Sequence, residues 1–110
     1  MLVETYRNCN SVSVAGLHLD VVRSKLAFGD RRTHVAPAVL RLMRHFVDAG
    51  GRALTKADLV AFMWPGREYS EPLRRNLEVH ISNLRAALRH IKAPITIGSS
   101  QRVGYRLDIA

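Results

Sequence analysis

The sequence predicts an α+β domain in which a small antiparallel sheet is followed by three helices and a terminal β-hairpin. Short apolar runs separated by turn residues occupy residues 11–35, helical periodicity fills residues 37–91, and strand alternation returns in residues 95–109. With 110 residues and an apolar fraction of 47%, the chain is expected to fold around one core. We therefore expect a lead-in segment at residues 1–10 and one domain at residues 11–110.

The first part of this domain is expected to be a small antiparallel meander. Its apolar residues come in short runs, which are Val12 and Val14, Leu17 and Leu19, Val21 and Val22, and Leu26 and Phe28. Gly16, Arg23-Ser24 and Gly29-Asp30 separate these runs, and Gly29-Asp30 is expected to be the tightest turn. Because a small sheet needs a packed face in water, we expect helices to cover it.

Two helices are expected next. The first spans residues 37–49, since proline suits a first helical turn and Gly50-Gly51 ends the apolar period. The second begins after Thr55, which is expected to cap it, and ends before Pro65-Gly66. Trp64 closes the apolar face of this helix and is expected to anchor the core, with a role as a stacking platform as the alternative.

The third helix is expected at residues 73–91, with Ser70 as its cap and Pro72 in its first turn. Apolar residues recur there at steps of four and three and so form one buried stripe. They are Leu73, Leu77, Ile81, Leu84, Leu88 and Ile91.

The opposite face of the third helix is basic and low in bulk. It carries Arg75, Glu78, Val79, Ser82, Asn83, Ala86 and Arg89, bordered by Arg74 and Arg85 on one side and by Asn76 and His80 on the other. Such a face suits a DNA major groove, which is about 12 Å wide, and Val79 offers a methyl-bearing surface to a thymine methyl. A solvated outer face is the alternative.

The end of the chain is expected to form a hairpin with arms at residues 95–97 and 103–109. Residues 98–102 lie between the arms, and their expected tip is Ser99-Ser100-Gln101-Arg102. The expected wing spans residues 98–104. An arginine at such a tip can enter the narrow minor groove of A·T-rich DNA, and Gln101, Arg102 and Arg106 are the candidates. A solvated turn is the alternative.

Charge favours a nucleic-acid partner. Lys and Arg number 17 against 9 Asp and Glu, which gives a formal charge of +8, and fourteen of the cations are Arg, whose planar fork suits phosphate and guanine. An anionic membrane surface is the main rival, followed by RNA bound through charge alone. No apolar run is long enough to span a membrane and no signal-peptide core is present, so we expect a cytoplasmic protein.

Catalysis and cofactors have no support in the sequence. A lone Cys9 excludes a cysteine-based zinc cluster, and the five His residues show no metal-ligand spacing. No Gly-rich phosphate loop, nucleophile elbow or paired-carboxylate arrangement is present. We therefore expect neither an enzyme nor a metal or cofactor site.

Strands, three helices and a terminal hairpin follow the order of a winged helix-turn-helix. Residues 13–109 resemble the effector domain of the OmpR/PhoB family of bacterial transcription regulators. The resemblance rests on Val35-Ala36-Pro37, on GGRALTKADLVAFMW through the second helix, on RNLEVHISNLRAAL in the third and on RVGYRL in the wing. The most specific signal is Val-His-Ile followed two residues later by Leu-Arg.

The resemblance implies a four-stranded N-terminal sheet, a third helix in the major groove and a wing at the minor groove. Together with the helix geometry it implies base reading by Glu78, Val79, Ser82 and Asn83, and contacts to the DNA backbone by Arg74, Arg75, His80, Arg85 and Arg89. The loop 65–72, with Arg67, Glu68 and Tyr69, corresponds to a segment that contacts RNA polymerase in several family members. A plain connector is the alternative. The family also implies a homodimer on tandem DNA sites.

The sequence departs from the family pattern at several positions. Ala36 stands where the first helix usually has a side-chain cap. Ser82 and Asn83 replace residues that are often basic, and Asn83 could pair bidentately with adenine rather than guanine. Gln101 and Arg102 displace the usual wing arginine by one position.

A phosphorylatable receiver domain of about 120 residues is usual in the family, and this chain has no room for one. The sequence is compatible with a naturally receiverless protein or with a trimmed one. The expected function is that of a sequence-specific, double-stranded-DNA-binding transcription regulator. The rival is a winged-helix interaction module that docks on RNA polymerase or another regulator and binds DNA weakly or not at all, since fold alone does not fix function.

Overall fold

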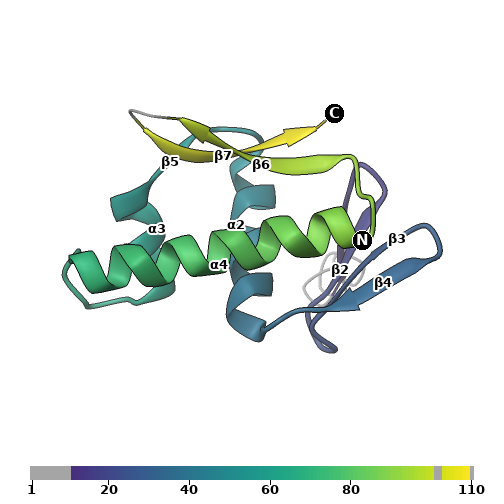
Figure 1. Ribbon diagram of the computed structural model, residues 1–110, viewed down its shortest axis with the longest axis horizontal. Helices are drawn as coiled ribbons and strands as arrows, with labels where there is room; N and C mark the ends of the chain where they lie inside the picture. Colours follow the sequence, from purple (N-terminus) through teal and green to yellow (C-terminus); the bar gives the residue numbers. More distant parts are fainter. Residues whose placement is uncertain (1–10, 101–102, 110) are drawn as a thin grey trace, which may run out of the picture.

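The computed structural model describes residues 11–100 and 103–109. In chain order its elements are β1 (Ser11–Val14), β2 (Leu17–Asp20), β3 (Lys25–Phe28), β4 (Arg31–His34), α2 (Pro37–Ala49), β5 (Leu54–Thr55), α3 (Lys56–Met63), α4 (Glu71–His90), β6 (Ile95–Ser100) and β7 (Gly104–Ile109). Figure 1 shows α4 as the long axis of the molecule, with α2 and α3 against it, the β5 to β7 strands along it and the four-stranded sheet near its C-terminal end. In this part of the chain no helix combines the length and apolar composition needed to cross a membrane.

The N-terminal sheet is antiparallel with strand order β1-β2-β3-β4, so the four-stranded expectation is confirmed. Gly29-Asp30 joins β3 to β4 as a two-residue turn, as predicted, because Phe28 pairs with Arg31. The expected strand at Val21-Val22 is wrong. Both residues lie in the β2–β3 connection, and Val22 is 72% exposed. The fourth strand is instead the polar Arg31–His34, which no apolar alternation marks.

The first two helices begin and end as the sequence predicts. Ala36 precedes α2 in extended conformation and makes no side-chain cap hydrogen bond, and Gly50 ends the helix with a φ of 64°. The Thr55 hydroxyl oxygen accepts a hydrogen bond from the Asp58 N–H at 2.9 Å, which caps α3. Trp64 ends α3 and packs, half-buried, against the core, which confirms it as a packing residue.

α4 begins at Glu71, two residues before the predicted start, because Ser70 caps it and Pro72 is accommodated in its first turn. The Ser70 Oγ accepts from the Leu73 N–H at 3.5 Å. The predicted apolar stripe is fully enclosed, with relative exposures between 0% and 5%. Its members Leu73, Leu77, Ile81, Leu84, Leu88 and Ile91 join the core formed by α2, α3 and both sheets.

The C-terminal sheet has three strands, in the order β5-β7-β6, where the sequence predicted a hairpin of two. The extra strand is Leu54–Thr55, which pairs with Tyr105 and Gly104 of β7. The predicted tip is also too long, because β6 continues to Ser100 and Gly98 pairs with Arg106 within the ladder. Ser99 and Ser100 therefore belong to β6, and the other two residues of the predicted tip, Gln101 and Arg102, lie outside the described residues.

Candidate nucleic-acid interface

One face of α4 is open to solvent along the whole helix. Its exposed members are Arg75, Asn76, Val79, Ser82, Asn83, Ala86, Arg89 and His90. Val79 is 55% exposed although it is apolar, and burying such a side chain against a partner is favourable. Three of the four predicted base-reading residues, Val79, Ser82 and Asn83, therefore share one accessible surface with Arg75 and Arg89.

Glu78, the fourth predicted base-reading residue, lies in a cluster of charges at the border of this face. Its Oε2 accepts a hydrogen bond from the Arg74 Nη1 at 2.5 Å and lies 3.8 Å from the Lys56 Nζ. Arg74 also donates to Glu71, and this hydrogen bond lowers the pKa of Glu71 and raises the pKa of Arg74. Arg74 is thus shared between two carboxylates, and Lys56 is a neighbour that the sequence pattern did not reveal.

Arg85 connects α4 to the wing. Its Nε donates to the Ile97 carbonyl oxygen at 2.9 Å, and its Nη2 donates to the Ser99 Oγ at 2.8 Å. The guanidinium carbon also lies 5.6 Å from the centroid of the Tyr105 ring, which is the geometry of a cation–π contact. The predicted contact of Arg85 with the DNA backbone stays a prediction, but the side chain already has three partners within the protein.

His80 packs against Trp64 on the other border of α4. The two rings are stacked with centroids 5.8 Å apart and an interplanar angle of 21°. The His80 Nδ1 is buried without a hydrogen-bond partner among the described residues. Burial lowers the pKa of His80 below its ordinary value of 6.5, because the charged ring is poorly solvated there.

This lowered pKa predicts a loss of stability in acid. The unfolded chain takes up a proton at His80 as the pH falls through 6.5, while the folded chain resists it. The free energy of unfolding should therefore be fully retained above pH 6.5 and should fall below it. Urea unfolding of the wild type and of His80→Phe, which keeps an aromatic ring beside Trp64, measures the effect, since the other histidines are common to both. Parallel pH profiles of the two proteins would contradict this assignment.

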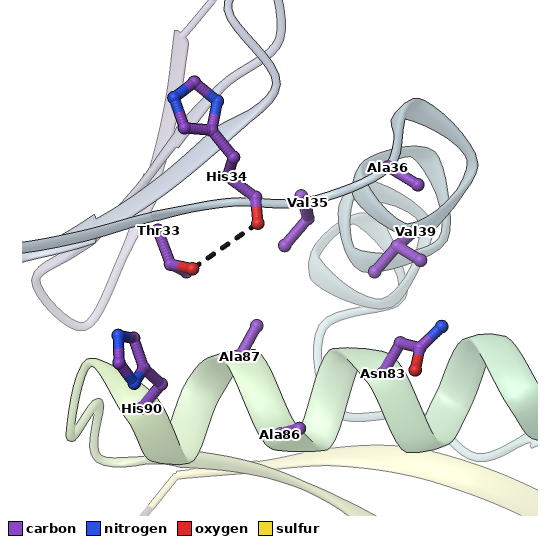
Figure 2. A pocket seen from close by; sticks show the side chains of 9 residues that line it. All are labelled: Thr33, His34, Val35, Ala36, Val39, Asn83, Ala86, Ala87 and His90. Carbon is purple, nitrogen blue, oxygen red and sulfur yellow. Dashed lines mark hydrogen bonds between the residues drawn. The ribbon is translucent and has the colours of Figure 1, made fainter.

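A groove of about 520 Å³ runs along the flank of α4 that faces away from the wing. It is lined by Thr33, His34, Val35, Ala36, Val39, Asn83, Ala86, Ala87 and His90. Figure 2 shows the Asn83 amide on the groove side of the helix, facing Ala36 and Val39, and His90 facing Thr33. The sequence pattern does not reveal Thr33, His34 and His90 as groove residues, because only the tertiary fold brings β4 beside α4.

The other predicted partner residues lie outside the α4 face. Arg106 in β7 is exposed, and its Nε donates to the Asp108 Oδ1 at 3.1 Å. Gln101 and Arg102 lie outside the described residues. Arg67, Glu68 and Tyr69 are exposed in the α3–α4 loop, and Tyr69 is 48% exposed. The structure thus brings the α4 face and the wing together and leaves this loop at the N-terminal end of α4.

Comparison with known proteins gives concordant matches. Residues 30–107 match the family model described as transcriptional regulatory protein, C terminal. The phosphate regulon transcriptional regulatory protein PhoB of Pseudomonas aeruginosa is 30% identical over 97 residues, which are 88% of this chain and 41% of that protein. The chain therefore spans about two fifths of the length of this relative.

Solved structures show the same fold. The DNA-binding domain of CadC from E. coli superposes with a TM-score of 0.77 at 19% identity, covering 92% of this chain and 94% of that one. The DNA-binding domain of RstA from Klebsiella pneumoniae, solved with the RstA box, gives 0.68 at 20% identity and covers 87% and 94%. On the family match over residues 30–107, this chain belongs to the family of C-terminal domains of transcriptional regulatory proteins, and its fold is the winged helix.

Proposed function

We propose that this chain acts in the cytoplasm as a sequence-specific regulator of transcription that binds double-stranded DNA, with α4 in the major groove and the wing at the minor groove. The observation that carries the proposal is the exposed face of α4, where small and polar side chains are flanked by Arg75 and Arg89 beside the wing. Support comes from the family membership and from the structural neighbour RstA, whose DNA-binding domain was solved in complex with the RstA box.

The geometry divides the work among the residues. Val79, Ser82 and Asn83 meet base edges, because they are exposed and short enough to let the helix backbone approach. Arg75 and Arg89 bind phosphates, since no carboxylate of the described residues forms an ion pair with either. These contacts fix the position of the helix, and the base contacts give sequence preference.

Four residues at the borders have a different part in this proposal. Glu78 can accept a hydrogen bond from a cytosine amino group in two ways: it keeps its contacts with Arg74 and Lys56, or it gives them up in exchange for the base. Arg85 and His80 hold the wing and Trp64, so we assign them to placing the reading face. We also propose, as a second role, that Arg74, Arg85 and His80 contact the DNA backbone.

Binding is expected to depend steeply on salt. If the protein neutralises about six phosphates, the plot of log K against log salt concentration has a slope of roughly −5. Fluorescence anisotropy with a genomic operator fragment measures this slope. The salt concentration is varied between roughly 50 and 300 mM, where counterion release dominates. A slope shallower than about −2 would contradict phosphate-based binding.

Substitutions on the α4 face should separate reading from positioning. Asn83→Ala is expected to relax the preference at one base pair by about 1 to 3 kcal/mol. Arg75→Ala is expected to weaken all sequences alike and to reduce the salt slope by about 1. Binding to a set of single-base operator variants measures both. If the two variants change the same sequences by the same factor, the division of roles is wrong.

The exposed α3–α4 loop favours a second partner. Tyr69 is 48% exposed beside Arg67 and Glu68, and exposed aromatic residues are frequent in protein interfaces. We propose that this loop contacts RNA polymerase when the protein is bound to DNA, and that two copies bind tandem sites. The rival function is an interaction module without useful DNA affinity. It predicts capture of polymerase by the immobilised protein together with no shift of any genomic fragment in a gel, and our proposal predicts a shift.

A further inference from the structure

The outer face of the N-terminal sheet carries a second basic surface. The strand register places His18, Ala27 and Arg32 in one row and Asp20, Lys25 and His34 in the next. Side chains alternate between the faces of a strand, and the intervening Leu17, Leu19 and Leu26 are fully buried. The two rows therefore point away from the core.

A hollow of about 300 Å³ lies over these rows. It is lined by His18, Asp20, Arg23, Lys25, Ala27 and Arg32. Ala27 sits between longer neighbours on both adjoining strands, and its short side chain leaves the space open. None of these residues lines the groove beside α4, so the hollow is separate from the proposed reading face.

The hollow has an excess of positive charge. Its single carboxylate, Asp20, accepts from the Arg23 backbone N–H at 3.0 Å and lies 3.9 Å from the Arg23 guanidinium. Within residues 11–100 and 103–109, neither Lys25 nor Arg32 forms an ion pair with a carboxylate. Lys25 and Arg32 are diagonal neighbours on β3 and β4, because Lys25 pairs with His34 and Arg32 with Ala27, so one anion in the hollow can contact both side chains. This arrangement therefore favours a bound anion.

The chemistry of the lining residues favours phosphate. Arginine presents a planar fork that matches phosphate oxygens, and lysine adds a compact charge. A space of about 300 Å³ is at the lower end of small-molecule sites, which suits a phosphorylated ligand of roughly nucleotide size. We propose that the hollow over Ala27 binds phosphoryl groups, supplied either by a free nucleotide or polyphosphate or by the backbone of DNA that flanks the operator.

Two variants and a control test the proposal on the full chain. Lys25→Gln combined with Arg32→Gln removes two charges from the hollow. Ala27→Leu fills the hollow and leaves its charge unchanged. The control, Arg52→Gln combined with Lys92→Gln, removes the same charge at exposed positions elsewhere. Tripolyphosphate is titrated against each protein and followed by the backbone amide NMR signals of β2 to β4.

If the phosphoryl groups come from a free ligand, we expect saturable shifts of these amides in the wild type and in the control, and binding about tenfold weaker in both hollow variants. A second arm compares a duplex limited to the operator with one extended by a helical turn on each side. If tripolyphosphate binds as described and both duplexes are insensitive to the variants, the source is a free ligand. If tripolyphosphate has no effect and only the extended duplex loses affinity in both hollow variants, the source is flanking DNA.

Three results would overturn the proposal. One is the absence of any response of β2 to β4 to tripolyphosphate together with equal binding of both duplexes by all variants. Another is a loss in the charge variant but not in Ala27→Leu, which would indicate diffuse attraction without a site. The third is tighter binding of polyglutamate than of tripolyphosphate, which would indicate an acidic protein partner. None of these results depends on whether α4 recognises its operator, which the operator-only duplex measures separately.

Discussion

Replacing Gly104 by alanine is expected to lower the free energy of unfolding by at least about 3 kcal/mol. Gly104 has a φ of +148°, which side-chain-bearing residues rarely adopt, and a Cβ there would lie 2.1 Å from the Leu54 carbonyl oxygen and 3.0 Å from the Thr55 Cα. Both obstacles are backbone atoms of β5. The substitution must therefore separate β5 from β7 and move the start of α3 away from the wing.

Gly98→Ala is the matched control in the facing strand. A Cβ at Gly98 would meet the Asp108 Oδ2, at 2.3 Å, but this atom is the end of a flexible, exposed side chain. Its displacement costs an exposed ion pair with Arg106, which is worth about 1 kcal/mol or less. Urea unfolding of both variants measures the difference. Similar losses in the two variants would show that the β5–β7 contact does not determine the stability of this sheet.

Arg85→Ala is expected to weaken binding to all DNA sequences by about tenfold or more and to lower the free energy of unfolding by about 1.5 to 3 kcal/mol. The reason is the loss of two charge-assisted hydrogen bonds, to the Ile97 carbonyl oxygen and the Ser99 Oγ. Without them only apolar packing, through buried residues such as Ile95 and Ile97, holds the wing against α4, and its position is less well defined. Equilibrium unfolding and operator binding measure the two effects.

Two further variants decide whether Arg85 acts through the wing. Arg85→Lys keeps the charge but cannot reproduce the forked pair of hydrogen bonds, so it should behave like Arg85→Ala. Arg89→Ala removes a charge from the exposed face of α4 and should weaken binding with little change in stability. Amide hydrogen exchange in β6 and β7 should accelerate in both Arg85 variants only. Wild-type affinity and exchange in Arg85→Lys would instead support a simple phosphate contact.

The local signals in the sequence predicted the local structure well. Thr55 and Ser70 cap their helices through hydrogen bonds to nearby backbone N–H groups, and such bonds depend only on residues three positions apart. The apolar stripe of α4 was predicted for the same reason, because its period is a property of one helix. The family resemblance predicted the four-stranded sheet. Apolar alternation alone would have put one of its strands at Val21-Val22.

Features that depend on distant parts of the chain were not predictable from patterns. The strand β5 is two residues long and exists only because β7 lies beside it, and its residues carry stronger signals for a helix cap. Gly98 resembles a turn residue in the sequence, yet it lies in a ladder whose partner side chain is flexible. The strand Arg31–His34 has no buried apolar residue to mark it, since its two arginines and His34 are exposed.

The same limit applies to the candidate site. The helical period correctly placed Val79, Ser82 and Asn83 on one open face. It could not show that Arg85 reaches Ile97, twelve residues away, because that contact depends on how the wing folds back on α4. Side-chain length and charge indicate which residues could contact DNA. Only tertiary packing shows which of them, such as Arg85, already form hydrogen bonds within the protein.

The hydrogen bonds of Arg85 to β6 have a consequence for the DNA sites that the proposed function requires. Because helix and hairpin are joined in one unit, the distance between the two grooves they enter is constant. Operators can then differ in the identity of their base pairs, whereas inserting a single base pair between the two contacted segments rotates one of them by about a tenth of a turn, out of reach.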